Sequence, residues 1–470
     1  MATRGATLAM LVLLAVVMPP PADGGPPRRP HVVVVLVDDL GWGDLSCFGG
    51  PTQTTQIDRL AAEGIRFRRF YVNAPICSPS RVALATGQYP QRWRISSYLD
   101  HRQHNESRGM AQWLDPAAPM LARALRETGY ATGHFGKWHM GGQRDVGDAP
   151  LITAYGFDRS LTNFEGLGPR VLPLCDPHDG TPPRRHDLGS AALGQGPIRW
   201  EDRSRVTAAF VAAATAFLDQ GVREGRPCFV NLWPDDVHSP YCPPVGAPDG
   251  GGKRDRYRAV LAALDRQLGV LFDHVRDSPA LRDNTLIILC SDNGHEDGAG
   301  SAGPLRGGKT WLYEGGVRSP LVVWGPGVIS PAAAGSSDDA TVFCSLDVVR
   351  SLYTITGTPL PPRASLDGFD VAPALTGRGP ARRGEPIFWR RPPDRPGADG
   401  HDNPDLAACD GRWKYYVNFD GSDPQLYDLE DDESEAENVV SLHPDIVARL
   451  QRETERWNAS LPGDAGMPPR

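Results

Sequence analysis

The 470-residue sequence lacks the features of several common protein classes. After residue 18, no segment reaches the roughly 18 consecutive apolar residues of a transmembrane helix, so we expect no stable membrane span. No long basic stripe is present and the formal net charge is -8, which argues against a nucleic-acid partner. The eight cysteines show no Cys-x-x-Cys or other zinc-type spacing, which argues against a cysteine-based metal site.

The one long apolar run lies at the N-terminus, where Thr7–Met18 follows the positive charge of Arg4. This run is too short to span a bilayer comfortably, and prolines and small residues follow it. We therefore interpret residues 1–25 as a signal peptide, with an uncleaved membrane anchor as the alternative. The mature chain is then expected to be secreted or periplasmic, or else lysosomal.

Short apolar runs alternate with amphipathic segments, which favours an α/β fold with a large, mostly parallel sheet sandwiched by helices. The run His31–Val37 is rich in β-branched residues and is typical of a buried, central strand. Further strands are predicted at Phe229–Trp233, Thr285–Cys290 and Leu321–Trp324. Helices are predicted at Gln56–Gly64, Met120–Gly129, Arg205–Gln220, Tyr257–Val275 and Leu346–Thr356.

A proline-rich stretch that begins at Pro359 marks a predicted domain boundary. We predict a large domain over residues 26–358 and a smaller α+β domain with an antiparallel sheet over residues 359–470. The segment Gly168–Gly196 is rich in glycine and proline and is predicted to form long surface loops. In the smaller domain, strands are predicted at Trp413–Phe419 and Gln425–Leu429 and a helix at Ile446–Trp457.

The segment Cys77-Ser-Pro-Ser-Arg81 combines three features of an anion site. Pro79 suits the first turn of a helix, where its missing N–H costs nothing. Cys77 would then lie at the helix N-terminus, whose free amides and dipole favour an anion. Arg81 lies on the same helix face and can reach back toward that anion. Taken alone, the pattern also fits an ordinary cysteine near a turn.

The longer segment from Cys77 to Gly87 resembles the signature of the type I, formylglycine-dependent sulfatases, an arylsulfatase-like family of the alkaline phosphatase superfamily: Cys-x-Pro-x-Arg followed by Thr-Gly. The resemblance implies an alkaline-phosphatase-like fold. It also implies that a formylglycine-generating enzyme oxidises Cys77 to formylglycine during maturation. Similar segments continue in family order from near residue 30 to near residue 440, so residues 26–358 would form the catalytic domain.

A second segment, Gly136-Lys-Trp-His139, places a cation two residues from a titratable base. In an extended segment, Lys137 and His139 would face the same side and could serve one reaction site. The segment is similar to the second sulfatase signature, Gly-Lys-x-His. For an isolated Lys-x-His, a solvated surface pair is the ordinary alternative.

Oxygen-donor side chains directly follow two of the predicted strands. Asp38 and Asp39 follow the first strand, and Asp292 and Asn293 follow the strand predicted to end at residue 290. Ligands of open α/β sheets bind at this carboxyl edge, and four hard oxygen donors suit Ca²⁺ or Mg²⁺ better than zinc or copper. Each pair taken alone also fits turn chemistry. The resemblance implies that the four residues, with modified Cys77, hold one Ca²⁺.

Two further candidates complete the set that the resemblance implies. His238 follows the strand predicted at Phe229–Trp233, and Lys309 lies in a stretch that resembles the family's Gly-x-Lys…Glu-Gly-Gly-x-Arg-x-Pro. Residues Gly303–Thr310 also match the phosphate-loop pattern G-x-x-x-x-G-K-T by letter. We reject a nucleotide site there, because no predicted strand precedes the loop.

The resemblance implies a sulfuric ester hydrolase that acts on a sulfated carbohydrate or an aryl sulfate through a covalent sulfate intermediate. Asp292 would act as the base for attack on sulfur, and the loops Ser97–Gln112 and Gly166–Arg199 would shape specificity. The alternatives are a phosphodiesterase or phosphonate monoester hydrolase of the same superfamily, and a carbohydrate-binding relative with a silent site. The implied catalytic residues are Cys77, Arg81, Lys137, His139, His238 and Lys309.

Overall fold

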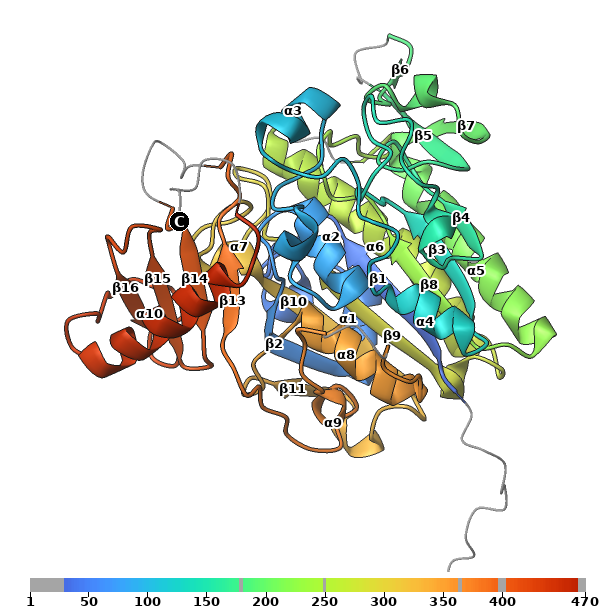
Figure 1. Ribbon diagram of the computed structural model, residues 1–470. Helices are drawn as coiled ribbons and strands as arrows, with labels where there is room; N and C mark the ends of the chain where they lie inside the picture. The colour runs from blue at the N-terminus through green and yellow to red at the C-terminus, as the bar shows by residue number, and fades with distance from the viewer. Residues whose placement is uncertain (1–28, 177–180, 248–250, 362–365, 396–402, 464–470) are drawn as a thin grey trace, which may run out of the picture.

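A computed structural model describes residues 29–176, 181–247, 251–361, 366–395 and 403–463 (Figure 1). The predicted signal peptide, residues 1–25, lies outside the described residues. No helix within the described ranges combines the length and the apolar character that a bilayer crossing requires.

The large domain is built on a mixed sheet in which the described residues form nine strands, in the order β11-β2-β10-β9-β1-β8-β3-β4 with β12 paired to β2 (Figure 1). The sheet is parallel from β9 to β4, and β10 runs antiparallel to both of its neighbours. The strands are β1 (His31–Val37), β2 (Ile65–Tyr71), β3 (Ala131–Gly136), β4 (Arg159–Leu161), β8 (Cys228–Trp233), β9 (Thr285–Ser291), β10 (Arg318–Trp324), β11 (Ser336–Asp338) and β12 (Phe343–Cys344).

Helices cover both faces of this sheet, which explains why β1 is apolar along its whole length. Alternate residues of β1 enter two separate cores, with Val34 on one face and Val35 on the other. Helices α2, α4 and α8 pack on the first face, and α1, α5 and α6 pack on the second. The helices of this domain are α1 (Thr55–Glu63), α2 (Cys77–Thr86), α3 (Arg102–Ser107), α4 (Leu121–Glu127), α5 (Val206–Glu224), α6 (Lys253–Asp277), α7 (Glu314–Val317) and α8 (Ser345–Thr356). Helix α9 (Ala372–Leu375) falls in the range predicted for the smaller domain, but Ala374 and Leu375 pack in the first core of the large sheet.

The structure confirms the strands and helices predicted for the large domain, with differences at their ends. Helix α6 begins at Lys253, before the predicted start at Tyr257, because its first turn is charged and shows no apolar periodicity. Strand β10 begins at Arg318 rather than Leu321. The predicted central position of β1 is confirmed, since β8 and β9 pair with it in parallel on either side.

The prediction of surface loops over Gly168–Gly196 was wrong for part of that segment. Two strands form there, β5 (Arg170–Cys175) and β6 (Arg184–Arg185), and they join β7 (Ile198–Asp202), which directly follows the segment, in a three-stranded sheet of order β6-β5-β7. Val171 and Leu172 are buried in it. Glycine and proline dominate the composition of the segment, and the apolar run of β5 is short, so the sequence carries little strand signal.

The smaller domain contains the predicted antiparallel sheet, in the order β13-β14-β15-β16, with one helix packed on it (Figure 1). Its apolar core also includes Tyr71, Ala83 and Tyr89 of the large domain, so the two domains share one hydrophobic interface. Within this interface Lys414 Nζ lies 2.8 Å from Glu314 Oε1, and both side chains are fully buried. The elements are β13 (Ile387–Arg390), β14 (Leu406–Cys409), β15 (Trp413–Val417), β16 (Gln425–Asp428) and α10 (Pro444–Ala459).

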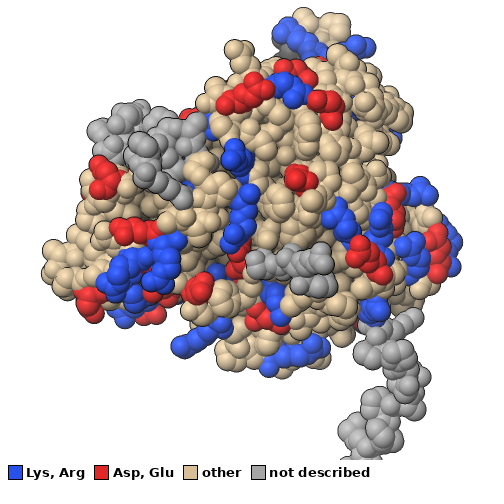
Figure 2. All heavy atoms as spheres, in the orientation of Figure 1, with Lys and Arg blue, Asp and Glu red and all other residues tan. Residues whose placement is uncertain are grey.

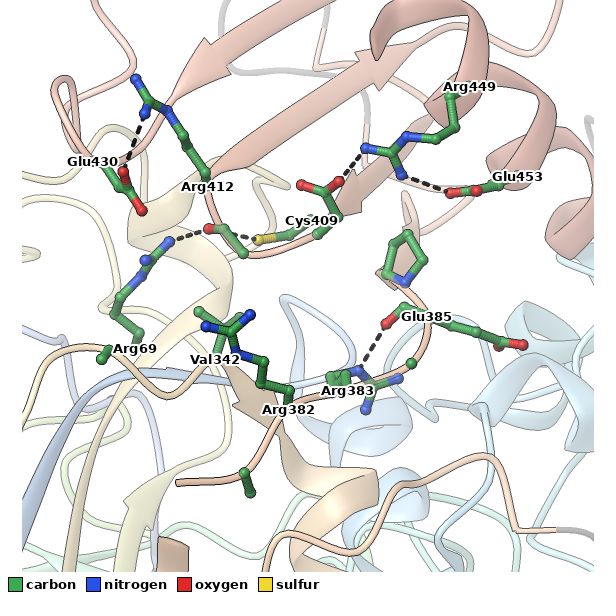
Figure 3. Close-up of a pocket in the computed structure, with 16 residues that line it drawn as sticks. Arg69, Val342, Arg382, Arg383, Glu385, Cys409, Arg412, Glu430, Arg449 and Glu453 are labelled. Atoms are coloured by element: carbon green, nitrogen blue, oxygen red, sulfur yellow. Dashed lines mark hydrogen bonds and ion pairs between the residues drawn. The ribbon is translucent and has the colours of Figure 1, made fainter. Parts of the chain in front are cut away.

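A polar cavity of about 470 Å³ lies where the two domains meet (Figure 3). Several arginines line it, but each of three pairs with a carboxylate: Arg383 with Asp347, Arg412 with Glu430, and Arg449 with Glu453. None of the residues predicted to carry chemistry lines this cavity. Of these pairs, Arg383–Asp347 links the smaller domain to the large one, and the other two lie within the smaller domain.

Candidate active site

Strand register brings the four predicted oxygen donors together. The last residues of β1 and β9 lie opposite each other in parallel register, so Asp38–Asp39 and Asp292–Asn293 leave the sheet side by side. Asn293 Nδ2 donates to Asp39 Oδ1 at 2.7 Å, across 254 positions of sequence. Asp38, Asp39 and Asp292 are fully buried, and each offers an oxygen within 4.8 Å of the others.

Cys77 is the first residue of α2, as predicted, with Pro79 in the first turn. Every residue of this helix is buried. One turn on, Arg81 Nη2 lies 2.7 Å from Asp292 Oδ2 and 3.4 Å from Asp38 Oδ1. The helix N-terminus that carries Cys77 therefore packs against the acidic cluster.

Two lysines complete the charge pairing at the end of the sheet. Lys137 Nζ lies 2.7 Å from Asp38 Oδ2, and Lys309 Nζ lies 2.7 Å from Asp39 Oδ2. With the Arg81–Asp292 pair, three cations face three carboxylates. Such pairing is what allows charges to persist where water is excluded.

The pKa values follow from this pairing. Burial alone would raise the pKa of Asp38, but Lys137 and Arg81 hold it well below its usual value. Burial alone would lower the pKa of Lys137, but Asp38 raises it. For Asp292, burial and the negative charge of Asp38 together raise the pKa to about 7. Among these groups, Asp292 is thus the one poised to exchange a proton near neutral pH.

The donor set fits a hard divalent cation. Within the described part of the chain, Asp38 Oδ1 and Asn293 Oδ1 are buried without a hydrogen-bond partner, an arrangement that is costly unless another ligand is present. Carboxylate and amide oxygens are the ligands of Ca²⁺ and Mg²⁺. The buried acidic cluster can therefore hold a metal ion.

His139 has a defined tautomer and one free nitrogen. Its Nε2 lies 2.9 Å from the carbonyl oxygen of Leu99, and since a carbonyl only accepts, Nε2 carries the proton. Its Nδ1 is buried and has no hydrogen-bond partner among the described residues. Burial and then the charge of Lys137 lower its pKa well below the usual value. The imidazole is therefore neutral and can accept a proton at Nδ1.

His238 has the opposite tautomer. Its Nδ1 donates to the carbonyl oxygen of Ser239 at 2.6 Å, and its Nε2 lies 3.7 Å from Asp39 Oδ2. Its side chain is 29% exposed and that of Lys309 is 17% exposed, whereas Asp39 is fully buried. These two residues mark the side on which the cluster opens to solvent.

Lys137 and His139 do not lie in the extended segment that the prediction assumed. Strand β3 ends at Gly136, and His139 has a φ of 54°, so the two residues do not alternate along an extended segment. Asp39 and Thr310 also have positive φ, at 60° and 77°. Non-glycine residues in the left-handed region concentrate at functional sites, where the surrounding structure holds them.

Glu165 is a site residue that the sequence did not reveal. Its Oε2 lies 3.3 Å from His139 Nε2, its carbonyl oxygen accepts from the His139 amide at 2.6 Å, and Arg144 Nη2 lies 3.9 Å from its Oε1. Burial raises its pKa to about 7. It stands in an ordinary Asn-Phe-Glu-Gly stretch with no motif, so only tertiary contact identifies it.

The structure agrees with the rejection of a phosphate loop at Gly303–Thr310. Turns precede the four-residue α7, and no strand leads into the loop. Lys309 points instead to Asp39.

The comparison with protein families decides which family this chain belongs to, because the family model described as Sulfatase matches residues 30–358. The chain belongs to the sulfatase family. The matched range contains all ten residues predicted to bind metal or catalyse, in the arrangement described above. This sulfatase is a sulfuric ester hydrolase with a mixed α/β fold.

Individual relatives agree with this assignment. The sulfatase is 31% identical over 459 residues to Arylsulfatase A of Homo sapiens, covering 88% of this chain and 85% of that protein. It is 30% identical over 497 residues to N-acetylgalactosamine-6-O-sulfatase of Bacteroides thetaiotaomicron, covering 88% and 90%. The crystal structure of Ps i-CgsB in complex with k-i-k-neocarrahexaose superposes with a TM-score of 0.75 at 26% identity, covering 93% of this chain and 94% of that one.

The surface charge of this sulfatase is mixed. Figure 2 shows basic and acidic side chains interleaved over the visible face, without one broad field of either sign. Because the formal net charge of the chain is -8, attraction of an anionic ester depends on the local cations of the buried cluster.

Proposed function

We propose that this sulfatase hydrolyses sulfate monoesters with formylglycine, made from Cys77, as its nucleophile. The observation that carries the proposal is the position of Cys77 at the N-terminus of α2, beside two lysines and the acidic cluster. Burial raises the pKa of the Cys77 thiol. A thiol held neutral is a poor nucleophile, so oxidation by a formylglycine-generating enzyme would supply the reactive group that the cysteine itself does not.

Asp38, Asp39, Asp292 and Asn293, with residue 77 after modification, would hold one Ca²⁺. Bound there, Ca²⁺ would polarise a sulfate oxygen. The three carboxylates and three cations of the cluster cancel in formal charge. A dication therefore leaves the site positive, which matches the single negative charge of a sulfate monoester.

In the first step, one hydroxyl of hydrated formylglycine attacks sulfur and the S–O bond to the alcohol breaks. Asp292 would take the proton of that hydroxyl, because its carboxylate contacts Arg81 at 2.7 Å, one turn along the helix that residue 77 begins. Arg81, Lys137 and Lys309 place positive charge around the point where negative charge develops. Residue 77 then carries the sulfuryl group.

The alcohol would leave on the side of His238 and Lys309. These are the two cluster members with the most exposed side chains, so the alcohol would depart toward solvent past them. Lys309 carries protons, and Nε2 of His238, which is unprotonated in this tautomer, can relay one. Together they would neutralise the departing oxygen.

In the second step, the second hydroxyl of residue 77 loses its proton to His139 Nδ1, the C–O bond to sulfate breaks, and the aldehyde returns. The free Nδ1 and neutral imidazole of His139 support this role. Water then hydrates the aldehyde for the next turnover.

We infer that the substrate is a sulfated carbohydrate or an aryl sulfate. N-acetylgalactosamine-6-O-sulfatase and Ps i-CgsB, whose names and ligand concern sugars, support the first. The segment 97–112 contains α3, and the segment 166–199 contains β5, β6 and the start of β7. These segments would contact the rest of the substrate. A secreted or periplasmic location, with a lysosomal one as the alternative, follows from the signal peptide proposed above.

The nucleophile is tested by mass spectrometry of tryptic peptide 70–81, from protein made together with a formylglycine-generating enzyme. We expect an aldehyde or its hydrate at residue 77; an intact cysteine under those conditions would refute the mechanism. Cys77→Ser, which lacks the second hydroxyl, should stop after one turnover with a sulfuryl group attached to residue 77. Sustained turnover by that variant would also refute it.

The alternative is a phosphodiesterase or phosphonate monoester hydrolase of the same superfamily. Rates on matched aryl sulfate, aryl phosphate diester and aryl phosphonate esters discriminate between these functions. We expect the highest kcat/KM on the sulfate ester. A higher value on a diester or phosphonate would replace the proposal.

A further inference from the structure

Two cysteines that are far apart in sequence meet beside the active site. Cys175 ends β5, and Cys242 lies in the loop between β8 and α6, yet their thiols are hydrogen-bonded to each other. All eight cysteines of the chain are free thiols in this structure. A thiol–thiol contact between two separate elements is the starting geometry for a disulfide.

We propose that Cys175 and Cys242 form a disulfide bond in the exported protein, and that this bond fastens the loop carrying His238 to the small sheet. The bond would covalently link β5 to a loop whose described residues form no strand pairing with it. The proposal concerns thiol chemistry and stands independently of the nucleophile at residue 77.

The surroundings show why fastening this loop matters. Arg203 follows β7 of the same small sheet and contacts the loop. Its Nη1 lies 2.8 Å from Asp236 Oδ1, and its Nη2 donates to the carbonyl oxygens of Asp235 at 3.1 Å and His238 at 3.4 Å. The small sheet thus already holds the backbone of His238 through one buried arginine, and the disulfide would add a second, covalent tie.

The two thiols differ in a way that sets the order of oxidation. Cys175 is the more exposed, whereas Cys242 is buried. Cys242 donates the hydrogen bond and Cys175 accepts it. Accepting this bond lowers the pKa of Cys175, and donating it raises the pKa of Cys242. Cys175 is therefore the thiol that ionises first and is reached first by an oxidant.

The reaction is a thiol–disulfide exchange with a disulfide such as oxidised glutathione. The Cys175 thiolate attacks one sulfur of the reagent, which releases one thiolate and leaves a mixed disulfide on Cys175. The Cys242 thiol then loses its proton and displaces the second thiolate. One S–S bond has formed in the protein, and the reagent has gained two electrons and two protons.

The test is a non-reducing tryptic digest of the full chain, exported to an oxidising compartment or treated with oxidised glutathione, with free thiols alkylated during denaturation. We expect peptide 171–184 linked to peptide 224–253. Because the second peptide also contains Cys228, two variants assign the bond. The link should persist in Cys228→Ser and disappear in Cys242→Ser. Alkylation of both Cys175 and Cys242 in the wild type, or a link that follows Cys228, would overturn the proposal.

A second measurement keeps the proposal testable if a variant folds poorly. Reduction of the wild-type protein should lower its melting temperature by about 3 °C, from the entropy of a disulfide-closed loop in a chain of this size. Cys175→Ser should melt at the same temperature with and without reductant. An equal response to reductant in both proteins would place the effect at another bond and overturn the assignment. Neither readout uses sulfatase activity, so the outcome is separate from that of the proposed mechanism.

Discussion

Lys137 and Asp38 form a fully buried ion pair, with Nζ 2.7 Å from Oδ2, that joins residues following β3 and β1. Strand β8 lies between those two strands in the sheet, so the pair spans the carboxyl edge above it. Asp38 raises the pKa of Lys137 against the opposing effect of burial. The lysine is therefore charged at any physiological pH and is available to an anionic substrate.

Replacing Lys137 by methionine should lower kcat/KM on an aryl sulfate by about 10²-fold or more, the usual effect of removing one group that stabilises transition-state charge. Steady-state kinetics on protein with a verified residue 77 would measure this. Lys414→Met is the matched control, because Lys414 is equally buried against a carboxylate, Glu314, in the domain interface. It should lower the melting temperature and leave kcat of the folded enzyme unchanged. An equal loss of kcat in both variants would contradict a specific role for Lys137.

Substitution of the two histidines should impair different steps of the reaction. His139→Ala should release about one equivalent of alcohol per enzyme in a burst and then turn over about 10²-fold more slowly or worse, because its step follows departure of the alcohol. His238→Ala should slow the burst itself. Pre-steady-state measurement of a chromogenic alcohol separates the two outcomes. A burst of unchanged rate in His238→Ala would remove that residue from the first step.

Glu165 should make the protein less stable as the pH rises. Burial raises its pKa from 4.5 to about 7 in the folded state, so the folded protein binds this proton more tightly than the unfolded chain. Its contribution is fully present below pH 4.5 and is lost as the pH rises through 7. The difference is on the order of 3 kcal/mol. Glu165→Gln should remove this decline, as urea unfolding at several pH values would show.

Glu314→Gln gives the control of opposite sign. Burial alone would raise the pKa of Glu314, but Lys414 and Arg318 lower it. Its contribution to stability is therefore present above pH 4.5 and is lost as the pH falls. Removing Glu314 should lower stability at neutral pH, whereas removing Glu165 should raise it. The same sign for both substitutions at pH 8 would contradict the assigned environments.

Removing divalent metal should destabilise the protein as well as inactivate it. Saturation at about 100 times the Kd adds about 2.7 kcal/mol of stability, so Ca²⁺ should raise the melting temperature above that in a chelator. Because the pKa of Asp292 is raised to about 7 without metal and a ligand must be deprotonated, affinity should increase as the pH rises through 7. Calorimetry in Ca²⁺, Mg²⁺ and chelator checks this. Identical melting in all three would exclude the cluster as a metal site.

Local patterns in the sequence predicted much of this protein. The strand His31–Val37, the helix that begins at Cys77, and the acids directly after two strands all rest on neighbouring residues, whose chemistry is visible in a short window. The α/β fold and the separate antiparallel sheet follow from the same kind of signal. These predictions held because apolar periodicity and helix-terminal residues report on local backbone structure.

The contacts on which the chemistry depends could not be predicted from the sequence and became visible only in the fold. The pairing of Asn293 with Asp39, the free nitrogens of His139 and His238, the presence of Glu165 beside His139, and the meeting of Cys175 with Cys242 all join distant segments. Sheet register and loop packing set these contacts, and both depend on which strands become neighbours. The sequence by itself determined which groups this sulfatase carries, but the order of its strands determined which groups meet, because spacing along a chain does not encode distance across a sheet.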